Sequence, residues 1–238
     1  MVIQSCWDYH LQPQAFLRWA ERVERLGTPV LNPSSLIRWN VDKSYLLALQ
    51  AAGVAVVPSI IITAGRYDLE GISDRLGSSQ LVVKPTVSAS ALDTYRVTAG
   101  TLEAAERIEA IRRRSDVLIQ PFLEQIALGE ISLMFFAGEF SHAVLKRPGP
   151  GDFRVQSEHG GSVEPVSDPP ASAVAAARRA VALAPALPTY ARVDGLIVDD
   201  RFILMELELI EPELFLSSRA GSADRLAACV MNILSGLQ

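Results

Sequence analysis

Apolar residues recur along the chain at two spacings, about 3.6 residues and two residues, which predict helices and strands respectively. In the range 13–26, for example, Phe16, Ala20 and Val23 form a helical stripe that Gly27 ends. The predicted helices cover residues 13–26, 41–52, 101–114, 171–184 and 222–237, and the predicted strands cover 2–5, 30–31, 54–62, 81–85, 95–97, 117–123, 131–136 and 140–145. The chain is therefore expected to mix helices and strands throughout.

The most informative stretch is 190–215, where two apolar runs meet at residues 199–201 and predict a β-hairpin. After the turn, Glu206 and Glu208 share one face of a strand that is otherwise apolar. A three-residue turn would place Asp194 opposite Glu206, on that same face. A two-residue turn would shift the register by one residue and send the two carboxylates to opposite faces.

Three carboxylates that converge on a buried hairpin would repel one another unless a cation neutralised them. If Asp194, Glu206 and Glu208 do converge, their oxygen ligands suit Mg²⁺ or Mn²⁺. Alternatively, the glutamates pair with arginine or lysine across a sheet, since charged residues in so apolar a strand need some partner. The spacing leaves both interpretations open.

Composition and charge narrow the class of protein. The chain has 238 residues, of which 49% are hydrophobic and 21% charged, as in globular proteins. Its formal net charge of −5 argues against a protein whose main partner is a nucleic acid. It contains two distant cysteines, no apolar run long enough to span a membrane and no signal-peptide pattern at its start. We expect a cytoplasmic protein that contacts neither nucleic acid nor membrane.

Two further segments are candidates for binding an anion. The strand 81–85 carries Lys84 and is followed by a small, hydroxyl-rich loop that includes Ser88, whose backbone N–H groups could cradle a phosphate. The stretch 146–161 is rich in glycine and proline and carries three cations, which indicates either a mobile loop that closes over an anionic ligand or an ordinary surface loop. Lys43, in the first turn of the helix 41–52, has no local signal of function and would ordinarily be a solvent-exposed lysine.

Taken in order, these features resemble the ATP-grasp ligases, and in particular the glutathione-synthetase-like members. The resemblance rests on the early lysine Lys43, the Val-Val-Lys-Pro strand with its small-residue loop, the apolar hinge at residues 120–123, the cationic loop and the Arg-x-Asp…Glu-x-Glu hairpin. The ranges 84–97, 190–195 and 205–212 are similar to the subgroup that closes the ring of cycloserine. The resemblance implies an α+β ATP-grasp fold, in which two α+β subdomains clasp ATP.

The resemblance also implies roles for individual residues. Lys43, Lys84 and Lys146 would lie near the nucleotide, the hinge would hold adenine, and Glu130 would bind the ribose hydroxyls. The implied nucleotide-binding residues are Lys43, Lys84, Ser88, Gln120, Pro121, Phe122, Leu123, Glu130 and Lys146, the implied ligands of one or two Mg²⁺ ions are Asp194, Glu206 and Glu208, and the residues implied to stabilise the transferred phosphoryl group are Arg192 and Arg154.

The reaction implied by the resemblance is attack of a substrate carboxylate on the γ-phosphate of ATP, which gives an acylphosphate that an amine nitrogen then opens. Such catalysis depends on positioning and charge neutralisation and needs no nucleophilic serine or cysteine. The expected partners are ATP, magnesium and a small amino-acid-like carboxylate, with cycloserine-type ring closure as one form of the reaction. Two alternatives are a nucleotide-binding protein without ligase activity and a kinase-like phosphotransferase.

Two departures from the family and one architectural expectation complete this interpretation. The loop after Lys84 has serine and alanine where many members have glycine, and Glu208 stands where asparagine is usual. Residues 1–31 are expected to be a remnant of a preceding Rossmann-like domain, and 32–238 the ATP-grasp domain, with subdomains at about 41–118 and 119–238. An open edge on the strand 2–5 would favour a homodimer, with the helix 13–26 at its interface.

Overall fold

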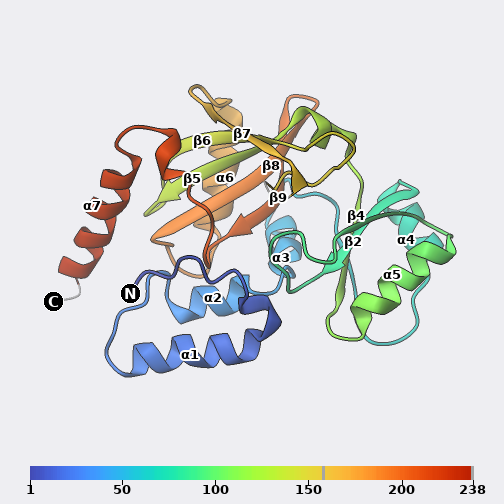
Figure 1. The fold of residues 1–238 in the computed structure, drawn as a ribbon, viewed down its shortest axis with the longest axis horizontal. Helices are drawn as coiled ribbons and strands as arrows, with labels where there is room; N and C mark the ends of the chain where they lie inside the picture. Colours follow the sequence, from blue (N-terminus) through green and yellow to red (C-terminus); the bar gives the residue numbers. More distant parts are fainter. Residues whose placement is uncertain (157–158, 237–238) are drawn as a thin grey trace.

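The computed structural model of the chain describes residues 1–156 and 159–236, and Figure 1 shows its ribbon. The helices are η1 (Tyr9–Leu11), α1 (Pro13–Arg25), α2 (Ser34–Asn40), α3 (Tyr45–Ala51), α4 (Leu69–Leu76), α5 (Leu102–Arg112), η2 (Glu124–Leu128), α6 (Ala171–Ala182), η4 (Leu216–Ser218) and α7 (Ser222–Ser235). The strands are β1 (Ile60–Ile62), β2 (Gln80–Pro85), β3 (Tyr95–Thr98), β4 (Val117–Pro121), β5 (Glu130–Phe136), β6 (Glu139–Arg147), β7 (Ser162–Val166), β8 (Tyr190–Val198) and β9 (Arg201–Glu208).

The strands form two separate antiparallel sheets. The smaller sheet has the order β1-β4-β2-β3, and the larger has the order β7-β6-β5-β8-β9. In Figure 1 the smaller sheet lies on the right with α4 and α5, whereas the larger sheet lies above α1, α2 and α3. The α+β class expected from the sequence is confirmed. None of the helices in the described part of the chain is both long and apolar enough to cross a membrane.

The smaller sheet buries one face against α4 and α5 and leaves the other for the site. Residues alternate along β2, so Leu81 and Val83 are buried in a core that also includes Ile108 of α5. The intervening Val82 and Lys84 point the other way and line a cavity. The strand period alone therefore places Lys84 on the cavity side.

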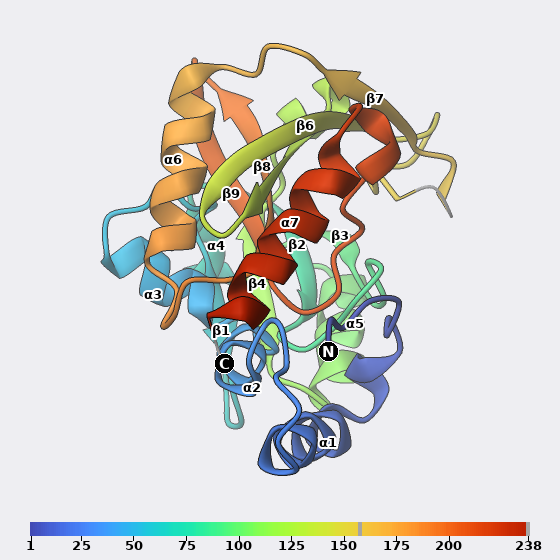
Figure 2. The same ribbon diagram turned by 90° about the vertical axis from the view of Figure 1, so that its left-hand side faces the viewer.

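The larger sheet is covered by α6 on one face and partly by α7 on the other, as Figure 2 shows. Alanines of α6 pack on Leu133 and Phe135 of β5, and their small side chains let the helix approach closely. On the opposite face, Met134 and Phe136 pack beneath α7. Further along that face β5 carries Ser132 and Glu130, so one face changes from apolar to polar along the strand. The polar end of this face belongs to the site.

The β8–β9 hairpin combines the two registers that the sequence left open. Its turn has two residues, because Val198 pairs with Arg201 and both intervening aspartates have positive φ. An irregularity in the pairing beside Asp194 leaves Met205 without a partner, and Asp194 therefore pairs with Glu206. This bulge offsets the shift that a two-residue turn would cause, so the two carboxylates share one face.

The helix predicted over 41–52 begins later than expected, at Tyr45, and α2 precedes it. The side chain of Asp42 accepts a hydrogen bond from the backbone N–H of Ser44 at 2.8 Å and another from the hydroxyl of Thr86 at 2.8 Å. These bonds, with the backbone bond from Lys43 to Thr86 at 2.9 Å, draw the segment toward the 86–91 loop and compete with helix formation. Lys43 therefore lies in a turn between two helices.

The strands predicted over 2–5 and 30–31 do not form, and only an isolated parallel bridge joins Val2 to Leu31. The first segment is instead held by packing, because Ile3 is buried with Leu17 of α1 and Ile210. The open strand edge that suggested a homodimer is therefore absent from the described residues. The homodimer stays a prediction.

The cationic stretch predicted as a loop over 146–161 is partly β-structure. Lys146 and Arg147 continue β6, and β7, which the sequence analysis missed, pairs with this end of β6. Lys146 is buried, so it is no part of a surface loop. The stretch also contains residues 157–158, which lie outside the described part of the chain.

Candidate functional site

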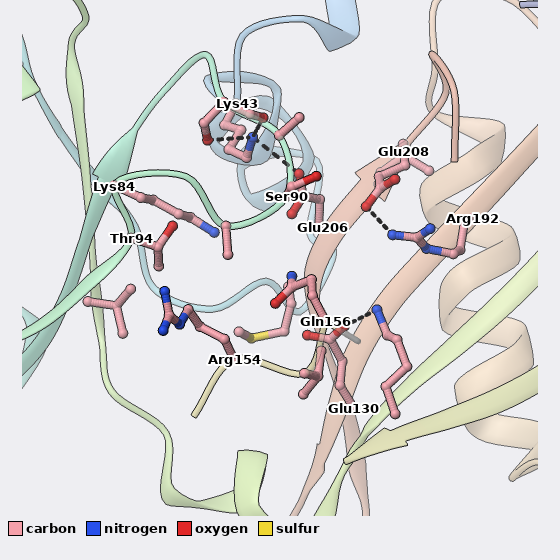
Figure 3. A pocket seen from close by; sticks show the side chains of 18 of the residues that line it. Lys43, Lys84, Ser90, Thr94, Glu130, Arg154, Gln156, Arg192, Glu206 and Glu208 are labelled. Atoms are coloured by element: carbon pink, nitrogen blue, oxygen red, sulfur yellow. Dashed lines mark hydrogen bonds and ion pairs between the residues drawn. The ribbon is translucent and has the colours of Figure 1, made fainter. Parts of the chain in front are cut away.

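One cavity of about 350 Å³ lies between the polar end of the larger sheet and the cavity face of the smaller sheet. In Figure 3, Lys84 reaches into it from the smaller sheet, whereas Glu206 and Glu208 lie on the larger sheet. The predicted site residues that line it are Lys43, Lys84, Ser88, Gln120, Pro121, Phe122, Leu123, Glu130, Lys146, Arg154, Arg192, Glu206 and Glu208. Asp194 is the one predicted site residue outside this lining.

On the larger sheet, Asp194 is the centre of a buried network of charges. Its side chain is 3% exposed and accepts hydrogen bonds from Arg192 Nε at 3.1 Å and from the Ser132 hydroxyl at 2.5 Å. Lys146 Nζ lies 3.3 Å from Asp194 and 2.5 Å from Glu130. Burial alone would raise the pKa of Asp194, but Arg192 and Lys146 outweigh it and lower that pKa to about 2. Asp194 is therefore ionised, and both of its carboxylate oxygens have protein partners.

The same network extends to the two glutamates of β9. Arg192 also binds Glu208, and Lys43 Nζ lies 3.2 Å from Glu206. Burial raises the pKa of Glu208 to about 8, because the neighbouring carboxylates oppose the attraction of Arg192. The pKa of Glu206 is lowered instead: burial raises it, but the charges of Lys43 and Lys84 outweigh that effect. The two glutamates therefore form the ion pairs with lysine and arginine that the alternative interpretation of the sequence expected.

These carboxylates can be judged as ligands for a divalent cation. The side chains of Glu206 and Glu208 are 29% and 27% exposed, and both line the cavity with oxygen atoms. These two residues fit Mg²⁺ or Mn²⁺. Asp194 has its oxygens bound by other side chains, and within residues 1–156 and 159–236 no group of three acidic, histidine or cysteine side chains is placed to hold a metal ion. The metal role of the three carboxylates stays a prediction.

Lys43 connects the two sides of the cavity. It is 5% exposed, and its ammonium donates to the backbone carbonyl of Ser88 at 2.7 Å in addition to pairing with Glu206. The ordinary solvent-exposed lysine considered from the sequence is therefore wrong. Lys43 holds the small-residue loop against β9.

The small-residue loop after Lys84 contains residues with positive φ, a conformation that usually requires glycine, although none of them is glycine. Ser90, Ala91 and Asp93 all have φ close to +50°. Each such non-glycine conformation costs on the order of 1–3 kcal/mol and tends to occur where function requires it. The serine and alanine residues therefore do not prevent a tightly curved loop, and Ser88 lines the cavity.

Lys84 differs from the other cations of the cavity because it has no partner. Among the described residues, no hydrogen bond or ion pair to its ammonium is present. Burial lowers its pKa, and the charge of Glu206 only partly offsets this. A partly buried, unpaired ammonium at a cavity wall is suited to an anionic ligand.

The hinge and residues 153–156 line the cavity together, and their apolar side chains share one small core. The guanidinium of Arg96 lies 3.9 Å from the ring centroid of Phe122. The ring of Phe153 packs edge-on against the same ring, with 5.8 Å between the two ring centroids. Arg154 also lines the cavity and is bound by Asp152 at 2.7 Å. The apolar surface beside backbone groups in this part of the cavity is suited to a flat heterocycle such as adenine.

Several cavity residues were missed from the sequence. Tyr9 and Trp7 line the cavity, as does Glu211, which follows β9. Asn40 lines the cavity and also bonds the edge of β9. Of these residues only Glu211 had a usable signal, because it and Glu213 are the charged residues in the apolar stretch after Glu208.

Known structures with this arrangement identify the fold. The chain superposes on the crystal structure of D-cycloserine synthetase DcsG with a TM-score of 0.86 and 29% identity, over 98% of this chain and 83% of that one. The chain has the ATP-grasp fold. A D-alanine–D-alanine ligase from Bacillus anthracis shares it at 20% identity, with a TM-score of 0.73 over 90% of this chain and 73% of that one.

Sequence comparison agrees with the structural neighbours of this ATP-grasp chain. It is 35% identical over 153 residues to the cycloserine biosynthesis protein DcsG of Streptomyces lavendulae, which covers 61% of this chain and 51% of that protein. It is 32% identical over 181 residues to a glutathione synthetase of Parasynechococcus marenigrum (strain WH8102), covering 74% and 53% respectively. The chain thus spans about half the length of these curated relatives. The resemblance to ATP-grasp ligases, including the cycloserine-forming one, is confirmed.

The first segment has its own match. Residues 1–32 match the family described as the N-terminal domain of D-cycloserine synthetase DcsG. Tyr9 and Trp7, which line the cavity, belong to this segment. The domain limits given from the sequence stay a prediction.

Proposed function

We propose that this chain carries an ATP- and Mg²⁺-dependent carboxylate–amine ligase site, and that its reaction is ring closure of an amino-acid-like substrate, as the name of its relative suggests. The proposal is carried by one observation: an unpaired Lys84, the apolar hinge and the paired carboxylates Glu206 and Glu208 line one cavity in the ATP-grasp fold.

In this proposal the base and ribose of the nucleotide bind in one part of the cavity and its phosphates bind in another. The hinge, with Phe122 and Leu123, packs against adenine, and Glu130 accepts hydrogen bonds from the ribose. Lys84 and Lys43 bind the phosphates, because both ammonium groups face the cavity between the hinge and β9. Charge-assisted bonds of this kind contribute roughly 1.5–3 kcal/mol each.

The transferred phosphoryl group lies near β9. A divalent cation held by Glu206 and Glu208 would supply neutralisation of the phosphate charge. Arg192, fixed by Asp194 and Glu208, presents its guanidinium to the carboxylate that is phosphorylated, and Arg154 acts from the segment between β6 and β7. The acylphosphate is then opened by a nitrogen of the substrate, with release of phosphate.

Steady-state ADP release distinguishes ligation from its alternatives. A screen of amino acids is expected to find one whose presence raises ADP release from ATP, and whose product contains a new carbon–nitrogen bond. An absence of release would indicate a nucleotide-binding protein, and release that yields a stable phosphorylated product without a new bond would indicate a kinase. Exchange of labelled phosphate into ATP that requires ADP and D-cycloserine would favour ring closure.

Glu206→Gln tests the metal-binding part of the proposal. The substitution keeps the shape of the side chain and removes one charge, so we expect turnover to fall by at least about 100-fold while the fold remains intact. The control is Glu164→Gln on β7, which removes the exposed partner of Arg147. Mg²⁺-dependent turnover near the wild-type rate in Glu206→Gln would remove this residue from the metal site.

A further inference from the structure

Two charged side chains of the cavity have no protein partner, one of each sign. Lys84 would bind the phosphates of ATP, whereas neither the nucleotide nor the metal ion in the proposed function accounts for Glu211. Glu211 is 7% exposed and lines the cavity, and within the described residues no hydrogen bond or ion pair to its carboxylate is present. A carboxylate so deeply buried is costly unless a ligand supplies positive charge.

The nearby cations are already engaged. Lys43 is paired with Glu206, and Arg192 is paired with Asp194 and Glu208. Glu211 therefore adds a further negative charge to a region in which Lys43 and Arg192 already face three carboxylates. A cationic group from outside the protein is what this part of the cavity lacks.

The backbone that carries Glu211 is held firmly. The side chain of Asn40 accepts from the N–H of Leu209 and donates to the carbonyl of Leu207, at 2.8 and 2.7 Å. The hydroxyl of Tyr190 donates to the carbonyl of Ile210 at 2.9 Å, and Asn32 donates to that of Leu209 at 2.8 Å. Such fixed placement is typical of a side chain that must meet a ligand in one position.

The wall around Glu211 is partly aromatic. Trp7 and Tyr9 line the cavity, and burial together with the charge of Glu211 holds the pKa of Tyr9 well above its usual range. The preceding Ile3 packs on Ile210, which ties this segment to the residue before Glu211. A carboxylate beside aromatic rings is the usual environment for a substituted ammonium. A hydrated metal ion instead favours several oxygen ligands.

We propose that Glu211 binds the ammonium group of an amino-acid substrate, and that Trp7 and Tyr9 complete this subsite. The inference rests on the proposed function, because it places the substrate beside the nucleotide in the same cavity. Glu211 then determines specificity: it favours carboxylates that carry a nearby ammonium group over those that do not.

Calorimetry on the intact protein, saturated with Mg²⁺ and the ATP analogue AMPPNP, tests the proposal. The probes are two amino compounds, D-cycloserine and D-alanine, and their counterparts without the amino group, isoxazolidin-3-one and propionate. We expect wild type to bind at least one amino compound about 10- to 100-fold more tightly than its counterpart, as for a charged hydrogen bond. In Glu211→Gln that preference should fall to within about 3-fold.

The matched control is Glu213→Gln. Glu213 also lines the cavity, but it is exposed and its carboxylate accepts from the backbone N–H of Phe215 at 2.9 Å. This variant should keep the wild-type preference, and Glu211→Asp should restore part of it. The wild-type measurement needs no variant and stands even if Glu211→Gln folds poorly.

The possible results separate this inference from the proposed function. The inference is overturned if wild type binds AMPPNP but neither amino compound, if it shows no preference for them, or if Glu211→Gln keeps the preference. It is also overturned if Glu211→Gln weakens AMPPNP binding only when Mg²⁺ is present, because Glu211 would then act on the metal. Failure of wild type to bind AMPPNP would overturn the proposed function itself.

Discussion

The two walls of the cavity use charge in opposite ways. On the larger sheet, Arg192, Asp194 and Lys146 satisfy one another and their neighbouring glutamates. On the smaller sheet, Lys84 stands alone beside the apolar hinge. The pairs of Arg192, Asp194 and Lys146 on the first wall form within the protein, whereas the second wall has a charge whose partner is not part of the protein.

This difference distinguishes charges that stabilise the folded site from a charge that is available to bind a ligand. Breaking a buried pair leaves its partner uncompensated, which costs stability. Removing an unpaired buried charge relieves a desolvation cost and weakens only the binding of its ligand. The same kind of substitution on the two walls should therefore have opposite effects on the stability of the ligand-free protein.

The largest effect is expected for Arg192→Met. It leaves Asp194 and Glu208 without their main cation, and we expect the free energy of unfolding to fall by about 3–5 kcal/mol. Urea unfolding of the ligand-free protein measures it. As a control, Arg147→Met removes the exposed pair with Glu164 and should cost about 0–1 kcal/mol. Equal losses in the two variants would contradict the network described for Asp194.

Lys84→Met is the counterpart on the smaller sheet. The free energy of unfolding of the ligand-free protein should stay unchanged or rise, because burial disfavours the unpaired ammonium. ATP binding measured by calorimetry should weaken by about 1.5–3 kcal/mol, the loss of a charged hydrogen bond. If stability falls as in Arg192→Met while ATP affinity is kept, Lys84 belongs to the structural charges and the contrast between the walls fails.

The smallest effect concerns pH and Glu211. Burial raises its pKa to about 7; the charge of Glu206 adds to this, whereas Arg192 and Lys43 oppose it. Because the folded pKa is raised, the folded state binds the proton more tightly, and stability is lost as pH rises from about 4.5 through 7. Glu208, with a pKa of about 8, also lowers the free energy of unfolding as the pH rises, over a slightly higher pH range.

Comparison of wild type with Glu211→Gln isolates this contribution. Between pH 5 and pH 8 the ligand-free wild type should lose about 1–2 kcal/mol more stability than the variant, because glutamine does not titrate. Urea unfolding at three pH values across this window measures the difference. Parallel losses in the two proteins would show that Glu211 has an ordinary pKa and is not a buried, unpaired carboxylate.

Local patterns determined much of the fold from the sequence alone. The strand predicted over 81–85 is observed as β2, and the 3.6-residue stripe placed α1 within one residue of its observed end. The family resemblance, rather than a local pattern, implied the hinge, whereas the carboxylates of the hairpin were found because charged residues interrupt an apolar run there. Such signals depend only on neighbours in the chain, so the sequence is sufficient to read them.

Only the tertiary structure decided which charges meet. The pairing of Asp194 with Glu206 depends on a bulge at Met205 that no turn length predicts. Lys146 proved to be a buried strand residue, because pairing of β6 with β7 extended the strand into a stretch that looked like a loop. Glu211 gained its place from the asparagines and tyrosine that hold its backbone, which come from residues as distant in sequence as Asn32. Desolvation and ion pairing act between surfaces brought together by folding, so the sequence could supply these groups but not their partners.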